Sequence, residues 1–90
     1  MNFIFGTGSN GLSFLRSTKM KINYFVDNDR NLWGKNFNSI KCISPSELKE
    51  KKISKIIIAT PAIENIKSQL KLMKISKSKI VISPELLDNI

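Results

Sequence analysis

Short apolar runs alternate along the chain with segments of helical spacing, and this alternation predicts an α/β protein. The apolar runs predict strands over residues 2–5, 21–26, 40–43, 55–60 and 79–82. The run Ile56-Ile57-Ile58 is apolar at each position, as expected for a central parallel strand that is covered on both faces. The pattern predicts one small domain over residues 1–90, with a five-stranded parallel sheet in the order 3-2-1-4-5 and helices on both faces.

Four segments carry the signals of helices. The first, 12–18, follows a glycine-rich stretch. The second, Ser44-Pro45-Ser46-Glu47, has a capping serine, a proline at the first helical position and a glutamate at the third, which together predict a capping box. The third is expected to begin at Pro61, with an apolar face formed by Ile63, Ile66, Leu70 and Met73. The fourth begins at Ser83-Pro84 and predicts a capped apolar helix over 84–90.

The segment 28–39 is rich in turn formers and has no helical period, so it predicts an ordered loop. In the expected topology this loop stands where a helix would otherwise cover one face of the sheet. Trp33 and Phe37 are expected to fill that gap by packing, with stacking on a nucleotide base as the alternative role for the two rings.

Three glycines follow the first strand at the spacing G-x-G-x-x-G, namely Gly6, Gly8 and Gly11. In such a loop the first glycine makes the tight turn, the second lets a pyrophosphate approach the backbone, and the third lets the next helix pack closely. The free N–H groups of that helix's first turn, and the positive end of its dipole, would face the anion. The spacing therefore predicts a loop that holds phosphate.

Asp27 follows the second strand, 21 positions after Gly6. At that distance a carboxylate meets the ribose hydroxyls of a dinucleotide or a nucleotide sugar. The strand order of the predicted sheet reverses beside the first strand, and Ala59-Thr60-Pro61 would line the opposite side of the crevice formed there. The sequence thus predicts a ligand crevice between the glycine loop and this segment.

The composition limits the chemistry of the chain, which has one cysteine and no histidine. A zinc or haem site and a Ser-His or Cys-His nucleophile are therefore not expected. Cys42 lies in an apolar strand and is expected to be a packed thiol rather than a nucleophile. No apolar run approaches the roughly 20 residues of a membrane span, and the first run breaks at Gly6, so we expect no membrane insertion and a cytoplasmic location.

The formal net charge of +8 raises the question of a nucleic-acid partner. The cations are 13 lysines and only two arginines. Surfaces that bind nucleic acids favour arginine forks and interleaved aromatic rings, so a nucleic acid is not the expected partner. The densest cluster, formed by Lys49, Lys51, Lys52 and Lys55, is expected to be solvated charge at a helix end and in a loop.

Taken together, five segments resemble the small Rossmann-like domains of bacterial surface-polysaccharide and sugar-nucleotide enzymes. They are Gly6-Thr7-Gly8-Ser9-Asn10-Gly11, Phe25-Val26-Asp27-Asn28-Asp29, Trp33-Gly34-Lys35, Ile43-Ser44-Pro45-Ser46-Glu47-Leu48 and Ile56-Ile57-Ile58-Ala59-Thr60. Such domains occur ahead of sugar-nucleotide epimerases or dehydratases, at the N-terminus of sugar acetyltransferases, and attached to some methyltransferases. The resemblance implies a ligand of the NAD or UDP-sugar type and no metal.

The resemblance also implies roles for individual residues. Gly6, Thr7, Gly8 and Gly11 would shape the phosphate loop, with hydrogen bonds offered by Ser9 and Asn10. Asp27 would contact the ribose or the base with Asn28 at the same rim, and Thr60 and Pro61 would close the opposite side. Structural explanations compete with these roles: a helix cap at Ser9 or Asn10, an Asx-type turn at Asp27 and a strand end at Thr60.

The sequence departs from that of a complete oxidoreductase. The Tyr-x-x-x-Lys pair is absent, because Tyr24 lies in a strand and is followed four positions later by Asn28. NAD or a UDP-type ligand is preferred over NADP, since Asp27 would repel a 2′-phosphate. We expect a nucleotide-binding module without its own catalytic machinery, excised from or working beside a larger sugar-modifying enzyme. That enzyme would be a sugar-nucleotide epimerase or dehydratase, an acetyltransferase or a methyltransferase.

Two other functions remain in view. The first is a docking or assembly domain, including a homo-oligomer, in which Leu12, Leu15 or Trp33 would be exposed. The second is a basic nucleic-acid binder, which the scarcity of arginine disfavours.

Overall fold

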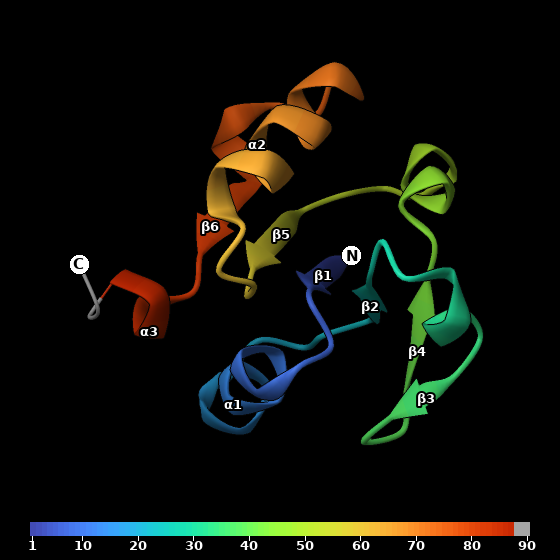
Figure 1. Ribbon diagram of the computed structural model, residues 1–90, viewed down its shortest axis with the longest axis vertical. Coiled ribbons are helices and arrows are strands. Elements are labelled where there is room, and N and C mark those ends of the chain that lie inside the picture. Colours follow the sequence, from blue (N-terminus) through green and yellow to red (C-terminus); the bar gives the residue numbers. More distant parts are fainter. Residues whose placement is uncertain (88–90) are drawn as a thin grey trace.

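One sheet forms the centre of the computed structural model, which describes residues 1–87 (Figure 1). Within these residues the strand order is β3-β4-β2-β1-β5-β6. The strands are β1 (Asn2–Phe5), β2 (Tyr24–Val26), β3 (Asn36–Phe37), β4 (Ile40–Ile43), β5 (Lys55–Ile58) and β6 (Ile80–Ile82). All pairings are parallel except that of β3 with β4. The expected order of the five parallel strands is confirmed, but the count of five is wrong because β3 adds a sixth strand.

Helices cover both faces of the sheet, as expected (Figure 1). They are α1 (Ser9–Ser17), α2 (Ile63–Leu72) and α3 (Pro84–Leu87), with 3₁₀ turns η1 (Arg30–Leu32), η2 (Pro45–Glu50) and η3 (Lys77–Lys79). Phe3 and Phe5 point to the face covered by α2 and η2, whose buried residues are Ile66, Leu70 and Leu48. Ile4 points to the other face, where α1 packs through Leu12, Phe14 and Leu15. The alternation of side chains along β1 thus divides the core into two layers.

The extra strand arises from a two-residue hairpin inside the segment expected to be a loop. Phe37 pairs with Ile40, and the two residues between them, Asn38 and Ser39, have φ of 50° and 67°. Two successive positive φ values are the signature of the turn that matches the twist of a tight hairpin. The pair Asn-Ser is a weaker signal than Asn-Gly, and the hairpin was therefore missed.

The two aromatic residues of this segment differ in their environment. Phe37 packs edge-on against Phe25, with ring centroids 6.0 Å apart, so its expected packing role is confirmed. Trp33 is 42% exposed, and its Nε1 donates to the carbonyl oxygen of Asp27 at 2.7 Å. The expectation that Trp33 fills the gap is wrong, because Leu32 of η1 packs there instead.

The ends of the helices differ in detail from the sequence patterns. The capping box at Ser44 is wrong: its hydroxyl pairs with that of Ser46 at 2.9 Å, and a 3₁₀ turn follows instead of an α-helix. Ser83 does not cap α3 with its side chain, since its buried Oγ has no hydrogen-bond partner among the described residues. In α2 the helix begins at Ile63, two residues after Pro61, with Ala62 as its N-cap. Residues 88–90 of the expected last helix lie outside the described residues.

Replacing Ser39 with glycine is expected to stabilise the fold by about 0.5–1 kcal/mol, because glycine adopts a positive φ without steric cost. Urea unfolding monitored by circular dichroism measures the change. Ser68→Gly is the matched control: this exposed serine lies inside α2, where glycine should instead destabilise the fold by about 0.5–1 kcal/mol. Equal effects at the two positions would contradict the assigned turn.

Candidate functional site

Three strand ends meet at one edge of the sheet. The glycine loop leaves β1, Asp27 follows β2, and Ala59 follows β5. Backbone hydrogen bonds hold them together: Gly6 N–H donates to the Val26 carbonyl at 2.8 Å, and Ala59 N–H donates to the Phe5 carbonyl at 2.9 Å. Strand β1 has β2 on one side and β5 on the other, so this edge is the point where the strand order reverses.

A pocket of about 430 Å³ opens at this point. Nine of the ten predicted site residues line it: Gly6, Thr7, Gly8, Ser9, Asn10, Asp27, Asn28, Thr60 and Pro61. Its remaining described lining comes from Phe5, Ala59, Ala62 and Ile66. Gly11, the tenth, does not line the pocket. The structure thus brings the predicted residues together, and their contact with a ligand remains a prediction.

Two of the three glycines are required by the backbone itself. Gly6 has a φ of +120°, and a Cβ there would lie 2.9 Å from the Ala59 carbonyl oxygen. A Cβ on Gly11 would overlap the carbonyl oxygen of Gly6, so α1 packs against the loop only because position 11 lacks a side chain. This is the close helix packing expected of the third glycine of the motif.

Gly8 differs from the other two glycines. No atom lies within 4 Å of the position that its Cβ would take, and its φ of −75° suits any residue. The local fold therefore does not need glycine there, whereas a phosphate approaching the backbone would need the absence of a side chain.

The N-terminus of α1 faces the pocket without a cap. Its N-cap residue is Gly8, no side chain accepts a hydrogen bond from its first turn, and that turn contains no acidic residue. The capping explanation for Ser9 and Asn10 is therefore wrong. The first-turn N–H groups have no carbonyl acceptors within the helix, which makes this end of α1 an electrostatically positive part of the pocket wall.

Asp27 fixes the conformation of the loop. Its Oδ2 accepts hydrogen bonds from Thr7 N–H at 3.2 Å and from Thr7 Oγ1 at 3.0 Å. Its Oδ1 accepts from Asp29 N–H at 2.9 Å, which confirms the Asx-type turn. A carboxylate has about four acceptor sites, so one more donor can still bind to Oδ1.

Asn28 makes a contact that the sequence did not reveal. Its side-chain amide exchanges two hydrogen bonds with that of Gln69 on α2, at 2.9 and 2.8 Å. Gln69 lies 41 residues further along the chain, and no local pattern distinguishes it from the other polar residues of α2. The pair links the rim of the crevice after β2 to the helix after β5.

The pocket contains little that could perform catalysis. Asp27 is the only ionisable side chain among the described residues that line it. Within residues 1–87, no three His, Cys, Asp or Glu side chains are grouped so as to hold a metal ion. In the same residues, no helix is both long enough and apolar enough to cross a membrane.

Cys42 is fully buried in β4, and its expected role as a packed thiol is confirmed. Burial, and less strongly the carboxylates of Asp27, Asp29 and Glu47, raise the pKa of this thiol to about 11. A thiol with so high a pKa carries almost no thiolate at neutral pH, which makes it a poor nucleophile.

The parallel sheet and the glycine loop at its switch point define a small Rossmann-like α/β domain. Residues 2–81 match the family described as C2185-like, N-terminal, and the chain belongs to that family. It is also similar to the crystal structure of UDP-D-quinovosamine 4-dehydrogenase from Vibrio fischeri. The identity is 25% and the TM-score 0.66, with 90% of this chain and 73% of that chain covered. No curated protein sequence matches the chain.

Gly11→Ala is expected to destabilise the fold by about 3 kcal/mol, because the added methyl group forces α1 away from the loop. Gly8→Ala is the matched control, and its free energy of unfolding should stay within about 1 kcal/mol of the parent, since the new methyl group meets open space. Chemical denaturation of both variants measures the difference. Similar losses at the two positions would contradict the packing described for Gly11.

The thiol of Cys42 is expected to make folding less stable at high pH. Between its ordinary pKa of 9.0 and about 11, the unfolded thiol loses its proton while the folded thiol keeps it, so stability falls as the pH rises. Urea midpoints at pH 8.5 and 10.5 measure the effect. Cys42→Ala should lose less stability over this interval than the parent chain, whose lysines and tyrosine it shares. An equal loss would rule out the buried thiol as a source.

Proposed function

We propose that the domain binds a nucleotide or nucleotide sugar, of the UDP-sugar or NAD type, in bacterial surface-polysaccharide or sugar-nucleotide metabolism. The observation that carries the proposal is the uncapped N-terminus of α1, which opens into a pocket that Asp27 also lines. The domain would bind this ligand without transforming it, as a module excised from or working beside a larger sugar-modifying enzyme.

The phosphate end of such a ligand would be held by backbone groups. No lysine or arginine is among the described residues that line the pocket, so charge neutralisation would depend on N–H groups and the dipole of α1. The open space beside Gly8 gives a diphosphate access to these N–H groups. The hydroxyls of Ser9 and Thr60 add donors around the same pocket.

The remaining acceptor capacity of Asp27 suits a sugar hydroxyl. Its Oδ1 accepts one hydrogen bond from the protein, and a ribose hydroxyl could donate a second. The same carboxylate disfavours a 2′-phosphate, which supports NAD or a UDP-type ligand over NADP. A pocket of about 430 Å³ lies near the lower end of the roughly 300–1,000 Å³ typical of small-molecule sites, which favours UDP over a whole dinucleotide.

The structural neighbour supports a sugar-nucleotide ligand. It is named as a dehydrogenase of UDP-D-quinovosamine, and the similarity covers 90% of the present chain. The present pocket contains Asp27 as its one described ionisable side chain, which supports binding rather than catalysis as the role of the domain.

Titration calorimetry of the full chain with UDP, UDP-N-acetylglucosamine and NAD tests the proposal. We expect saturable binding of at least one of them at micromolar to sub-millimolar concentration. Gly8→Val should weaken that binding at least about tenfold, because its side chain fills the space that a diphosphate needs. Its far-ultraviolet circular dichroism should match that of the parent chain.

Gly34→Val is a control for the glycine substitution, since Gly34 also has open space around its Cβ position but does not line the pocket. Its positive φ of 83° makes it less stable, while its ligand affinity should stay unchanged as long as it is folded. The absence of heat and of a thermal shift with all three ligands at millimolar concentration would sink the proposal.

A further inference from the structure

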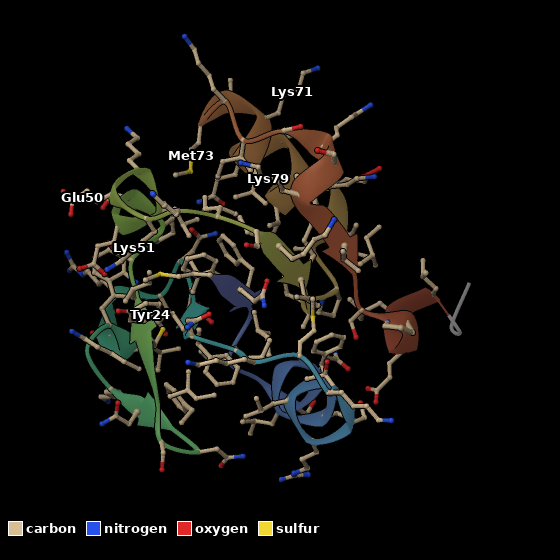
Figure 2. The ribbon with its side chains drawn as sticks, turned by 180° about the vertical axis from the view of Figure 1, so that it is seen from behind. Tyr24, Glu50, Lys51, Lys71, Met73 and Lys79 are labelled. Carbon is tan, nitrogen blue, oxygen red and sulfur yellow. The ribbon has the colours of Figure 1, made fainter. Side chains whose placement is uncertain are left out.

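A second, differently charged cleft lies at the opposite edge of the sheet. It has a volume of about 420 Å³, and five lysines line it: Lys49, Lys51, Lys52, Lys74 and Lys79. Their segments lead into the amino ends of β5 and β6, whereas the glycine loop leaves the carboxyl end of β1. Figure 2 shows two of these side chains, Lys51 and Lys79, which the fold brings to one cleft from separate parts of the chain. We name these five residues the lysine cleft.

The lysine cleft carries more positive than negative charge, although Glu50 lies between Lys49 and Lys51 in the sequence. None of its described lining residues is acidic, and the ion pair between Lys67 and Glu64 lies outside the cleft. Lys51 Nζ lies 4.8 Å from the centre of the Tyr24 ring, a contact that does not neutralise its charge. The N-terminal ammonium donates to the Lys52 carbonyl at 2.9 Å and adds a further positive charge nearby.

Helix ends explain only part of this arrangement. The C-terminus of α2 carries the equivalent of about half a negative charge, which lysines near it would offset. The turn η2, which ends at Glu50, is a 3₁₀ segment of six residues and adds little. Lys79 ends η3, a 3₁₀ turn of three residues that also adds little, so five ammonium groups exceed what these helix ends require. The expectation of solvated helix-end charge concerned Lys49, Lys51, Lys52 and Lys55, and it did not include Lys74 or Lys79.

Lys74 occupies a position where glycine would be more stable. It follows the C-cap of α2 with a φ of +64°. Its N–H donates to the Lys71 carbonyl at 2.9 Å, and the next N–H, of Ile75, donates to the Leu70 carbonyl at 3.1 Å. These two bonds form a Schellman motif, whose left-handed residue is usually glycine. A lysine in that conformation has a steric cost, and this residue is one of those lining the cleft.

We propose that the lysine cleft binds a compact oligophosphate anion. The site is concave and five lysine residues line it, so their long side chains could bring several ammonium groups around a small anion. Lysine is a point charge without the planar fork of arginine, so the cleft selects for charge density rather than for a fixed planar shape. Phosphates linked in one molecule supply this density, either as free oligophosphate or as the phosphate chain of a nucleotide. The proposal does not depend on the function of the glycine-loop pocket.

Inorganic tripolyphosphate, titrated into the full chain by calorimetry at about 50 mM salt without divalent cations, is the direct probe. We expect saturable binding that weakens as salt is raised. Lys51→Gln/Lys79→Gln should weaken it at least about tenfold. The control Lys35→Gln/Lys41→Gln removes the same charge from exposed positions around the β3–β4 hairpin, and its affinity should change less than about twofold. Equal losses of affinity in the two variants would show that net charge alone explains the binding, and this would overturn the proposal.

Lys74→Gly gives a test in which stability and binding move in opposite directions. The melting temperature should rise by about 2–5 °C, because glycine relieves the left-handed conformation. The affinity for tripolyphosphate should fall about threefold or more, because one ammonium group is lost. Unchanged affinity in this variant would contradict a role for Lys74 in the cleft.

Two further measurements separate this site from others. Gly8→Val should bind tripolyphosphate as the parent does, and loss of binding there would assign the anion to the glycine loop instead. Adenosine triphosphate should compete with tripolyphosphate if its phosphate chain suffices, and failure to compete restricts the site to free oligophosphate. A single-stranded oligonucleotide that binds more tightly than tripolyphosphate at equal phosphate concentration would overturn the assignment to a compact anion.

Discussion

The central position of β1 is the constraint on which the architecture depends. Its three apolar residues, Phe3, Ile4 and Phe5, are at most 2% exposed, and β1 pairs with β2 on one side and with β5 on the other. The chain first builds outward through β2 and β4, and then returns to add β5 and β6 beyond the opposite side of β1. Connections leaving β1 and β2 therefore diverge from that leaving β5, and a crevice forms between them.

Asp27 affects both the conformation of the glycine loop and the charge of the pocket. A carboxylate close to a phosphate loop would repel the ligand if its charge were free. Here Thr7 donates two hydrogen bonds to it, and Asp29 donates a third, so its charge also serves to hold the loop in place. The same bonds order the loop before any ligand arrives, which reduces the entropy that binding must remove.

The sequence predicted the parts of the fold that follow from local patterns. Apolar runs located the five parallel strands, and the glycine spacing located the loop and helix that form one side of the pocket. The hairpin at Asn38-Ser39 was missed because residues other than glycine hold its positive φ values. The partnership of Asn28 with Gln69 was missed because it joins positions 41 residues apart.

The composition of the lysine cleft could likewise be predicted only in part from local sequence patterns. The lysines between 49 and 55 form a visible cluster in the sequence, and their location after a predicted helix gave a sufficient local explanation. Lys74 and Lys79 join this group only through the crossover from α2 to β6. The conformation of Lys74 could not be expected either, since the residue after a helix C-cap is usually glycine.

The amide pair between Asn28 and Gln69 has a consequence for the space available beside the glycine loop. Asn28 lines the glycine-loop pocket and Gln69 lines another hollow of about 680 Å³, so the hydrogen-bonded pair connects the linings of the two spaces. Two exposed neutral hydrogen bonds contribute about 1–2 kcal/mol, which leaves the pair open on the order of a tenth of the time. Opening of the pair would join the two spaces, so a ligand of the proposed kind could extend past Asn28 and Gln69 only while these hydrogen bonds are broken.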